Sequence, residues 1–431
     1  MTAEIVIMNK SAIALAADSA VTVQLSIKGE VRQKIYNTTN KLFMLSKYSP
    51  IGILVYGNAD ILGTPWELII KEYRKKLATK KFSTIKAQAL DFIKYLNTYF
   101  ASMQQEIEFR NSVAGYFSEI ILNNINTSVE KEVQDSDGIN EEKIKEIVAS
   151  EISSSYSDLI KRENLDGVPN NYVSILIRKY GGVIDDVIKT IFRDLPLKKA
   201  EYENLRTIAA CLYAKAIFPD SSSGIIIAGF GEDEKFPSLF AINSHGVVNN
   251  HLKYSIKQDV KLGIDQPAAI IPFAQQDMVV TFIEGVDPGF NQLLDGYLSK
   301  IFNEYPKVIF ENLSDIPEDM KKIMVEKLQK QGYDIYDKLR IALQEYKDTQ
   351  NVSQITSVVE FLPKDELAAM AESLVNLTSF KRRVSLDAET VGGPVDVAVI
   401  SKGDGFVWIK RKQYFKAELN PHFADNYYRD C

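Results

Sequence analysis

The chain has few of the residues that form disulfide frameworks, histidine triads and zinc sites. Its 431 residues include two cysteines, Cys211 and Cys431, and three histidines. Two cysteines build no disulfide framework, which is typical of proteins from a reducing compartment. No Cys-x-x-Cys or His-x-x-x-His spacing occurs, although zinc needs three or four clustered ligands. We therefore expect no metal and no cofactor, and we interpret His245 as a solvated residue of a hairpin turn at 243–246.

Long apolar runs and a strong net charge are also missing. No run reaches the roughly 18 apolar residues of a membrane span, and the first residues lack the basic and apolar regions of a signal peptide. There is no Walker A loop and no Gly-x-Gly-x-x-Gly. The formal charge of −6 is mild and gives no reason to expect nucleic acid or an anionic membrane as partner. We expect a soluble, cytoplasmic protein.

The apolar pattern alternates between strand-like and helix-like segments. Short apolar runs separated by turn residues predict strand hairpins in the first 60 residues, the second of them turning at Gly29. Later segments read as helical over 61–220, as strands over 223–273, as helical over 276–380, and as closing strands and a tail over 394–431. Two packed antiparallel sheets with helix layers outside satisfy this order. The sequence therefore predicts an α+β fold, a four-layer αββα sandwich with large helical insertions, in a single domain over 1–431.

Three details of this pattern are specific enough to check. Thr64 followed by Pro65 predicts a helix start with Thr64 as its N-cap. Ser83 predicts a second helix start. The polar stretch 128–155 is interpreted as a linker or an exposed helical insertion.

Chemistry is suggested by three residues near the first predicted hairpins. Thr2 directly follows the initiator methionine, Asp18 ends the second apolar run, and Lys34 follows the next hairpin, at intervals of 16 and 16 residues. Each has an ordinary explanation by itself: Asp18 as a turn residue and Lys34 as a solvated lysine, as most are. Together they fit an N-terminal nucleophile.

Removal of Met1 would give Thr2 a free amine beside its hydroxyl. A hydroxyl needs a base near neutral pH, and an α-amino group has a reference pKa of about 7.7–8.0. A neighbouring lysine would keep that amine neutral and stabilise the developing alkoxide, and an aspartate would hold the lysine.

This trio resembles proteasome β-subunits and the bacterial ATP-dependent proteasome-like peptidase. Their mature N-terminal threonine is followed by aspartate and lysine at the same intervals. The blocks that share the resemblance occur in the family's order: Ala16-Ala-Asp-Ser-Ala, Tyr56-Gly-Asn-Ala-Asp, Gly224-Ile-Ile-Ile-Ala-Gly, Pro237-Ser-Leu-Phe-Ala-Ile and Gly392-Gly-Pro-Val-Asp-Val-Ala-Val-Ile.

The resemblance implies a threonine endopeptidase that cleaves polypeptides inside a self-assembled ring of six or more chains, with a separate ATPase unfoldase as a possible partner. It implies catalytic roles for Thr2, Asp18 and Lys34, and an oxyanion N–H from Tyr56 or Gly57. Substrate is expected along a segment that includes Ala20 and Thr22.

Several features depart from the family pattern. Tyr56 stands where the family has its oxyanion glycine, the chain is about twice the usual length, and both helical regions are enlarged. Ala388 and Val391 stand where the family has an accessory aspartate and serine before its closing strand, and the adjacent Asp387, Glu389 and Thr390 could substitute after a shift of one residue. Two other functions stay open: a non-catalytic assembly subunit capped by Met1, and an N-terminal-nucleophile amidase acting on small amides.

Overall fold

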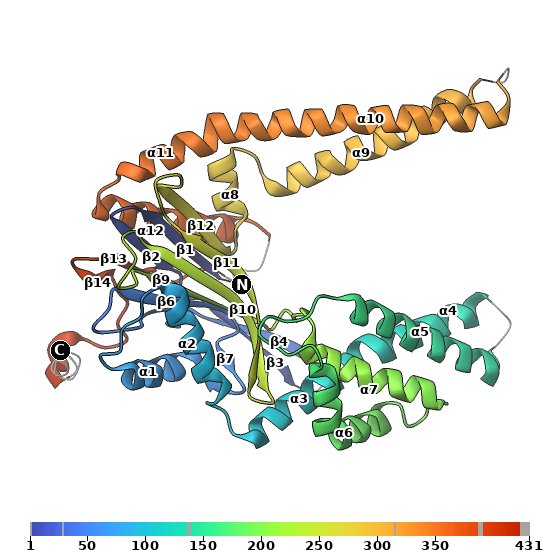
Figure 1. The fold of residues 1–431 in the computed structure, drawn as a ribbon, viewed down its shortest axis with the longest axis horizontal. Coiled ribbons are helices and arrows are strands. Elements are labelled where there is room, and N and C mark those ends of the chain that lie inside the picture. Colours follow the sequence, from blue (N-terminus) through green and yellow to red (C-terminus); the bar gives the residue numbers. More distant parts are fainter. Residues whose placement is uncertain (1, 28–29, 136–138, 314–315, 387–390, 423–431) are drawn as a thin grey trace. The chain divides into compact units, whose positions relative to one another are not determined.

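The computed structural model describes residues 2–27, 30–135, 139–313, 316–386 and 391–422. It has mixed α and β structure with antiparallel sheets (Figure 1). The chain divides into two compact units, Met1–Leu42 with Lys261–Cys431 and Phe43–Val260. None of the helices in the described part combines the length and the apolar character that a membrane crossing requires.

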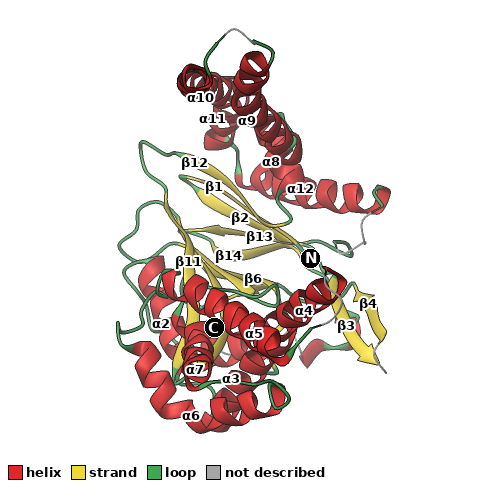
Figure 2. Ribbon diagram, turned by 90° about the vertical axis from the view of Figure 1, so that its right-hand side faces the viewer, coloured by secondary structure: helices red, strands yellow, loops and turns green. Residues whose placement is uncertain are grey.

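A five-stranded sheet forms the centre of the first unit, in the order β12-β1-β2-β13-β14 (Figure 2). The predicted first hairpin is confirmed, since β1 and β2 pair with Glu4 opposite Ala17. The closing strands also pair as predicted, with Ser401 opposite Gly405. The bounds are β1 Ala3–Asn9, β2 Ala12–Ala17, β12 Ala268–Ala274, β13 Asp396–Ser401 and β14 Gly405–Lys410.

Helix α12 packs on one face of this sheet. Ala12, Ala14 and Ala16 of β2 belong to the same buried cluster as leucines and alanines of α12. Three small side chains on one face of a strand let a helix approach the sheet closely, and the buried apolar surface stabilises the contact. The helices of this unit are α8 Asp277–Glu284, α9 Pro288–Glu311, α10 Glu318–Lys347, α11 Ser353–Phe361 and α12 Lys364–Val384.

Helices α9 and α10 pack against each other along their length (Figure 1). The ring of Phe302 lies 6.1 Å from the ring of Tyr336. Gly332 leaves room for Phe302, because a Cβ there would stand 3.0 Å from its ring. The Tyr336 hydroxyl donates to Asp295 Oδ1 at 2.6 Å, which satisfies its polar end.

The second unit is built around a sheet in the order β11-β10-β9-β6-β5. The predicted β9–β10 hairpin is confirmed, with Ser244 opposite Ser223. Helices α1 and α2 share a buried cluster with this sheet, in which Tyr73 and Phe92 meet edge to face at 4.9 Å. The bounds are β5 Leu42–Met44, β6 Ile51–Gly57, β9 Ser223–Gly229, β10 Ser238–Val248, β11 His251–Lys261, α1 Trp66–Leu77 and α2 Ile85–Asn97.

Both predicted helix starts move by one residue. Thr64 pairs with Ile61 in the small β7–β8 ribbon (Asp60–Ile61 and Thr64–Pro65), so Pro65 is the N-cap of α1. Thr84, rather than Ser83, caps α2, because its hydroxyl accepts a hydrogen bond from Ala87 N at 3.1 Å.

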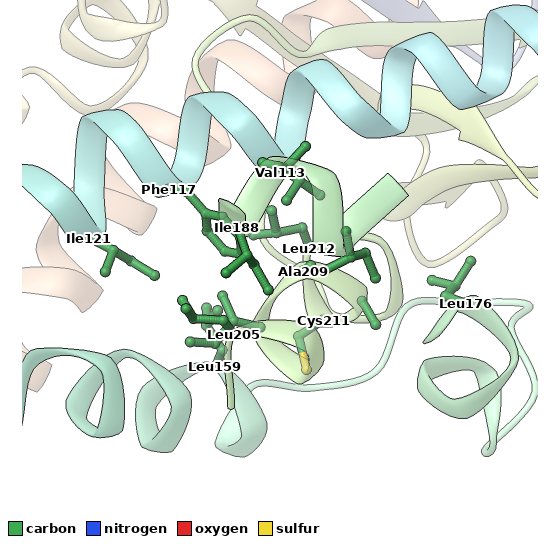
Figure 3. Packing of buried hydrophobic residues seen from close by; sticks show 14 of the residues in the cluster. Val113, Phe117, Ile121, Leu159, Leu176, Ile188, Leu205, Ala209, Cys211 and Leu212 are labelled. Atoms are coloured by element: carbon green, nitrogen blue, oxygen red, sulfur yellow. The ribbon is translucent and has the colours of Figure 1, made fainter. Parts of the chain in front are cut away.

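Five further helices form a separate core in the second unit. Their bounds are α3 Ser102–Tyr116, α4 Asn123–Asp135, α5 Glu141–Lys161, α6 Tyr172–Ile191 and α7 Lys199–Ala214, with a π-helical turn at Phe117–Leu122. Figure 3 shows Phe117, Ile188 and Leu205 close together in this core. The polar stretch 128–155 is helical over 128–135 and 141–155, and it buries Val148 and Ile152.

The interpretation of His245 as a solvated turn residue is wrong. Strand β10 continues to Val248, and the turn falls at Asn249 and Asn250, which have φ of 55° and 56°. Two such residues suit a tight hairpin turn. His245 is 17% exposed, and burial, followed by the positive charge of Lys253, lowers its pKa to about 4.

The hairpin predicted near Ser26 is confirmed, with Ser26 opposite Val31 in β3 Val21–Ile27 and β4 Glu30–Tyr36. Its predicted turn at Gly29 lies outside the described residues. Because β4 ends only at Tyr36, the hairpin determines which lysine lies close to Asp18.

Candidate functional site

Asp18 directly follows β2, and its buried carboxylate joins separate segments of the first unit. Its Oδ1 accepts hydrogen bonds from Ala3 N at 3.1 Å and from Lys41 Nζ at 2.5 Å. Its Oδ2 accepts from Ala20 N at 3.1 Å and from Gly392 N at 3.0 Å. Buried charge is stable only when it is paired and hydrogen-bonded, so Asp18 has the environment of a structural or catalytic centre.

The cation beside Asp18 is Lys41, and Lys34 does not occupy that position. The side chain of Lys41 is 5% exposed, and its Nζ also lies 3.7 Å from Glu4 Oε1. Lys34 lies within β4, has an exposed side chain, and holds its Nζ 5.0 Å from the ring centroid of Tyr36. Among the described residues, no ion pair or hydrogen bond connects Lys34 to Asp18.

The equal 16-residue intervals predicted that Lys34 would lie beside Asp18, and it does not because the β3–β4 hairpin extends beyond Lys34. Lys34 is still inside its second strand, opposite Val23. The chain returns to the site only after the strand ends, where Thr39 N donates to Ser19 O at 3.1 Å. Lys41 then enters the site just before β5 begins at Leu42.

Thr2 directly precedes β1 and is 4% exposed. Its Oγ1 donates a hydrogen bond to Glu4 Oε2 at 3.0 Å, and its carbonyl accepts from Gln275 N at 3.1 Å. Gln275 is held in turn by Arg382 Nε, which donates to its Oε1 at 2.7 Å. The threonine is therefore fixed by its neighbours on both sides; Met1 lies outside the described residues.

Glu4 is a site residue that the sequence reasoning missed. It is fully buried in β1 and faces the same side as Thr2, because side chains alternate along a strand. Burial raises its pKa to about 8, Lys41 opposes the rise and Asp18 adds to it. An acidic residue inside an otherwise apolar strand was the available signal.

We expect Glu4 to make stability depend on pH. The unfolded carboxyl releases its proton near the ordinary pKa of 4.5, whereas the folded one keeps it up to about 8. The unfolded chain binds fewer protons between these values, so the free energy of unfolding falls as pH rises from 4.5 to 8. The slope reaches at most about 1.4 kcal/mol per pH unit for one proton.

Glu4→Gln provides the control, because glutamine mimics the neutral carboxyl. Urea unfolding at pH 5, 6, 7 and 8 measures both proteins, and their difference removes the titrations that they share. We expect wild type to lose stability relative to Glu4→Gln across this range. Parallel pH profiles for the two proteins would contradict the raised pKa.

A second buried ion pair lies on the same sheet. Asp396 is opposite Ala17, which is opposite Glu4, so these side chains share one face of the sheet. Lys412 donates to Asp396 Oδ2 through Nζ at 2.5 Å and to Oδ1 through its backbone N at 2.8 Å. Burial lowers the pKa of Lys412, Asp396 opposes this, and the charge of Lys41 adds to it.

A loop before β13 closes over Asp18. Gly392 donates to Asp18, and its carbonyl accepts from Ser19 N at 3.0 Å. Gly393 has φ +76°, and a Cβ there would stand 2.8 Å from Asn37 O, so glycine is required. The accessory candidates expected just upstream, Asp387, Glu389 and Thr390, lie outside the described residues.

Of the two predicted substrate-binding residues, both of which the structure describes, only Ala20 is hydrogen-bonded to the ion pair. Ala20 is buried and donates its N–H to Asp18. Thr22 stands opposite Ile35 in the β3–β4 hairpin. Its Oγ1 is buried, and within the described part of the chain it has no hydrogen-bond partner.

Tyr56 and Gly57 lie in the second unit, at the end of β6. The ring of Tyr56 fills the space beside Gly224, where a Cβ would stand 1.9 Å from it. Gly57 is opposite Ser223 with φ +82°, and a Cβ there would stand 2.3 Å from Ser222 O. The strand end therefore has a backbone conformation that only glycine fits.

Gly57→Ala should destabilise the protein more than Gly63→Ala does. Both glycines have positive φ, but nothing lies within 4 Å of a Cβ at Gly63. Gly63→Ala should cost about 1–2 kcal/mol from the left-handed backbone alone, and Gly57→Ala about 1–3 kcal/mol more from the clash. Urea unfolding measures both, and equal losses would contradict the described strand end.

Comparison with known proteins assigns no family to the chain, so the function is inferred from the geometry of the site. The chain matches no protein-family model, and no curated protein matches it. Within the described residues, no group of three or more His, Cys, Asp or Glu side chains is placed to hold a metal ion. The first unit offers a buried hydroxyl at Thr2, a titrating carboxyl at Glu4 and a lysine–aspartate pair, which suits proton transfer and nucleophilic attack.

Proposed function

We propose that the chain is an N-terminal-nucleophile hydrolase resembling proteasome β-subunits and the bacterial ATP-dependent proteasome-like peptidase. Thr2 is its nucleophile, and polypeptides are its substrates. The observation that carries the proposal is the buried Lys41–Asp18 pair, bonded through Asp18 Oδ1 to the N–H of Ala3, the residue next to Thr2. A lysine exposed to water is solvated and does not require a buried carboxylate as its partner.

The proposed reaction begins when Met1 is removed. The Thr2 amine, with a reference pKa of about 7.7–8.0, takes the proton of the hydroxyl. Thr2 Oγ1 then attacks the scissile carbonyl carbon, and the amine returns the proton to the departing nitrogen. Water, deprotonated by the same amine, hydrolyses the resulting ester and restores Thr2.

Lys41 takes the role that the family resemblance implied for Lys34. Its ammonium keeps the Thr2 amine neutral and stabilises negative charge on Oγ1, while Asp18 holds it in place. Glu4 accepts the hydrogen bond of Oγ1 and orients the hydroxyl. The oxyanion N–H of Tyr56 or Gly57, and substrate alignment along Ala20 and Thr22, enter the proposal from the family resemblance.

The fold and assembly belong to the same proposal. Each of the two five-stranded sheets has helices on a face, which supports a four-layer αββα sandwich. We propose a ring of six or more copies, served by a separate ATPase that unfolds substrates. Closed symmetry is the usual solution for such subunits.

Removal of Met1 is the first test. Threonine is small enough for methionine aminopeptidase to act, so the intact mass of untagged protein should lack one methionine. The processed protein should react with a peptide epoxyketone, which requires both the hydroxyl and the free amine. Processed protein that neither reacts nor cleaves fluorogenic peptides would contradict the proposal.

One observation favours a second candidate, the non-catalytic assembly subunit. The Thr2 hydroxyl is buried and already donates to Glu4, an arrangement that a structural threonine would also have. A mass spectrum in which every chain retains Met1, together with normal assembly, would establish this alternative.

A further inference from the structure

Helix α9 carries a row of exposed apolar side chains on the side that does not contact α10. Buried Phe310 and the half-buried Phe302 mark the side turned to α10, where Phe302 meets Tyr336. The exposed residues are spaced three or four apart, which places them on one face of a helix. This α9 stripe consists of Phe290, Leu293, Tyr297, Ile301, Tyr305 and Val308.

The α9 stripe is as large as the largest apolar patches found on single-chain proteins, and patches of that size often have a binding role. Its six side chains are each 49–63% exposed. Large apolar and aromatic side chains offer about 150–250 Å² each, so the stripe exposes roughly 600 Å², the upper end of the largest patch on a typical monomer. An open groove of about 480 Å³ runs beside it between Leu293 and Tyr297.

The area and the charge together identify the occupant. Two copies of the stripe would bury roughly 1,200 Å², the lower limit of a specific interface. Helices α9 and α10 carry nine basic and nine acidic residues between them, so they have no net charge to repel a second copy. Membrane-surface helices and nucleic-acid-binding faces carry an excess of Lys and Arg instead.

We propose that the α9 stripe is a subunit interface, packed against the α9–α10 hairpin of a second copy of this chain. The inference rests on the proposed self-assembly and names one surface that takes part in it. Catalytic chemistry plays no part in it, so epoxyketone labelling and association are separate readouts.

The test measures the mass of the full-length protein by sedimentation velocity at 1–50 μM. Tyr297→Glu with Ile301→Glu puts charges in the centre of the stripe, and Tyr297→Ala with Ile301→Ala removes area without adding charge. Lys307→Glu is the control, because Lys307 is exposed on the same helix about 100° away from Val308. We expect wild type and Lys307→Glu to assemble alike, and the Glu pair to weaken association at least tenfold.

Each other outcome counts against the proposal in its own way. If wild type assembles and both stripe variants assemble equally well, the interface lies elsewhere while the ring stands. If wild type stays a single chain, whether free or bound to another protein or to vesicles, the interface and the ring both fail. Circular dichroism must show the same helicity in all variants, as expected for exposed positions.

Discussion

Lys41→Met should lower peptide turnover by about 10²–10³-fold in processed protein. Lys41 is the buried cation that Asp18 holds, and in the proposed mechanism it keeps the Thr2 amine neutral and stabilises the alkoxide. Removing one such preorganised electrostatic partner typically costs about 3–4 kcal/mol of barrier. Methionine is nearly the same length and fills the same space, so the change isolates the charge. Turnover of a fluorogenic peptide and the rate of epoxyketone labelling measure the effect.

Lys34→Met is the matched control. The same chemical change is made seven residues earlier, on an exposed side chain whose described neighbour is the Tyr36 ring. Turnover should stay within twofold of wild type and stability within about 0.5 kcal/mol. A large loss in Lys34→Met with none in Lys41→Met would reverse the assignment.

Lys41→Arg separates position from charge. Arginine keeps the positive charge, but its planar guanidinium replaces a compact ammonium in a space where the lysine Nζ is 2.5 Å from Asp18 and 3.7 Å from Glu4. We expect little recovery of turnover. Full recovery of turnover would mean that Lys41 acts through its positive charge alone, and that the exact position of its ammonium does not matter.

Local pattern was sufficient to predict most strands. Strands β1 and β2 are joined by the short turn 10–11, and β9 and β10 are consecutive strands joined by the loop 230–237, so each pairing involves apolar runs that are close in the sequence. The predicted helix starts are wrong by one residue. Thr64 and Ser83 are suitable N-cap residues, but the residue after each of them is the N-cap in the structure. His245 was misplaced because Gly246, with φ +66°, lets the strand continue where glycine usually indicates a turn.

The site was predicted less well, for a physical reason. Thr2 and Asp18 are positioned by one hairpin, whose length the sequence reveals. The cation comes after a second hairpin, and spacing alone does not say whether Lys34 ends a strand or lies inside it. A burial argument would have separated the candidates: Lys41 directly precedes the apolar run 42–45, whereas Lys34 ends the polar run 32–34.

Asp18→Asn should destabilise the protein by about 3–5 kcal/mol. It removes the carboxylate closest to the buried Lys41 charge and leaves Glu4 Oε1, 3.7 Å away, as the nearest acidic oxygen, and breaking one side of a buried pair has a cost of this size. Each oxygen of Asp18 accepts two hydrogen bonds, one oxygen from Ala3 and Lys41 and the other from Ala20 and Gly392. In asparagine an NH₂ group replaces one of these oxygens and cannot accept the two hydrogen bonds on that side. Urea unfolding at pH 7 measures the loss.

Asp259→Asn is the control for removing an aspartate that pairs with lysine. Asp259 Oδ2 lies 2.8 Å from Lys86 Nζ, but the side chains are 29% and 43% exposed. Exposed pairs are worth about 0–1 kcal/mol, so this variant should unfold almost like wild type. A similar small loss for Asp18→Asn would mean that water reaches the Asp18 site.

The combination of Asp18→Asn with Lys41→Met decides whether the two residues act as one unit. Each single change strands a buried charge, whereas the double change removes both charges and leaves neutral groups of similar volume. The double variant should therefore be less destabilised than the sum of the singles, by about 1–3 kcal/mol of coupling. Its turnover should be no lower than that of Lys41→Met, because the catalytic charge is already gone. Additive losses in both stability and rate would show that Asp18 organises its three backbone donors independently of Lys41, and the site would then be a structural junction at the end of β2.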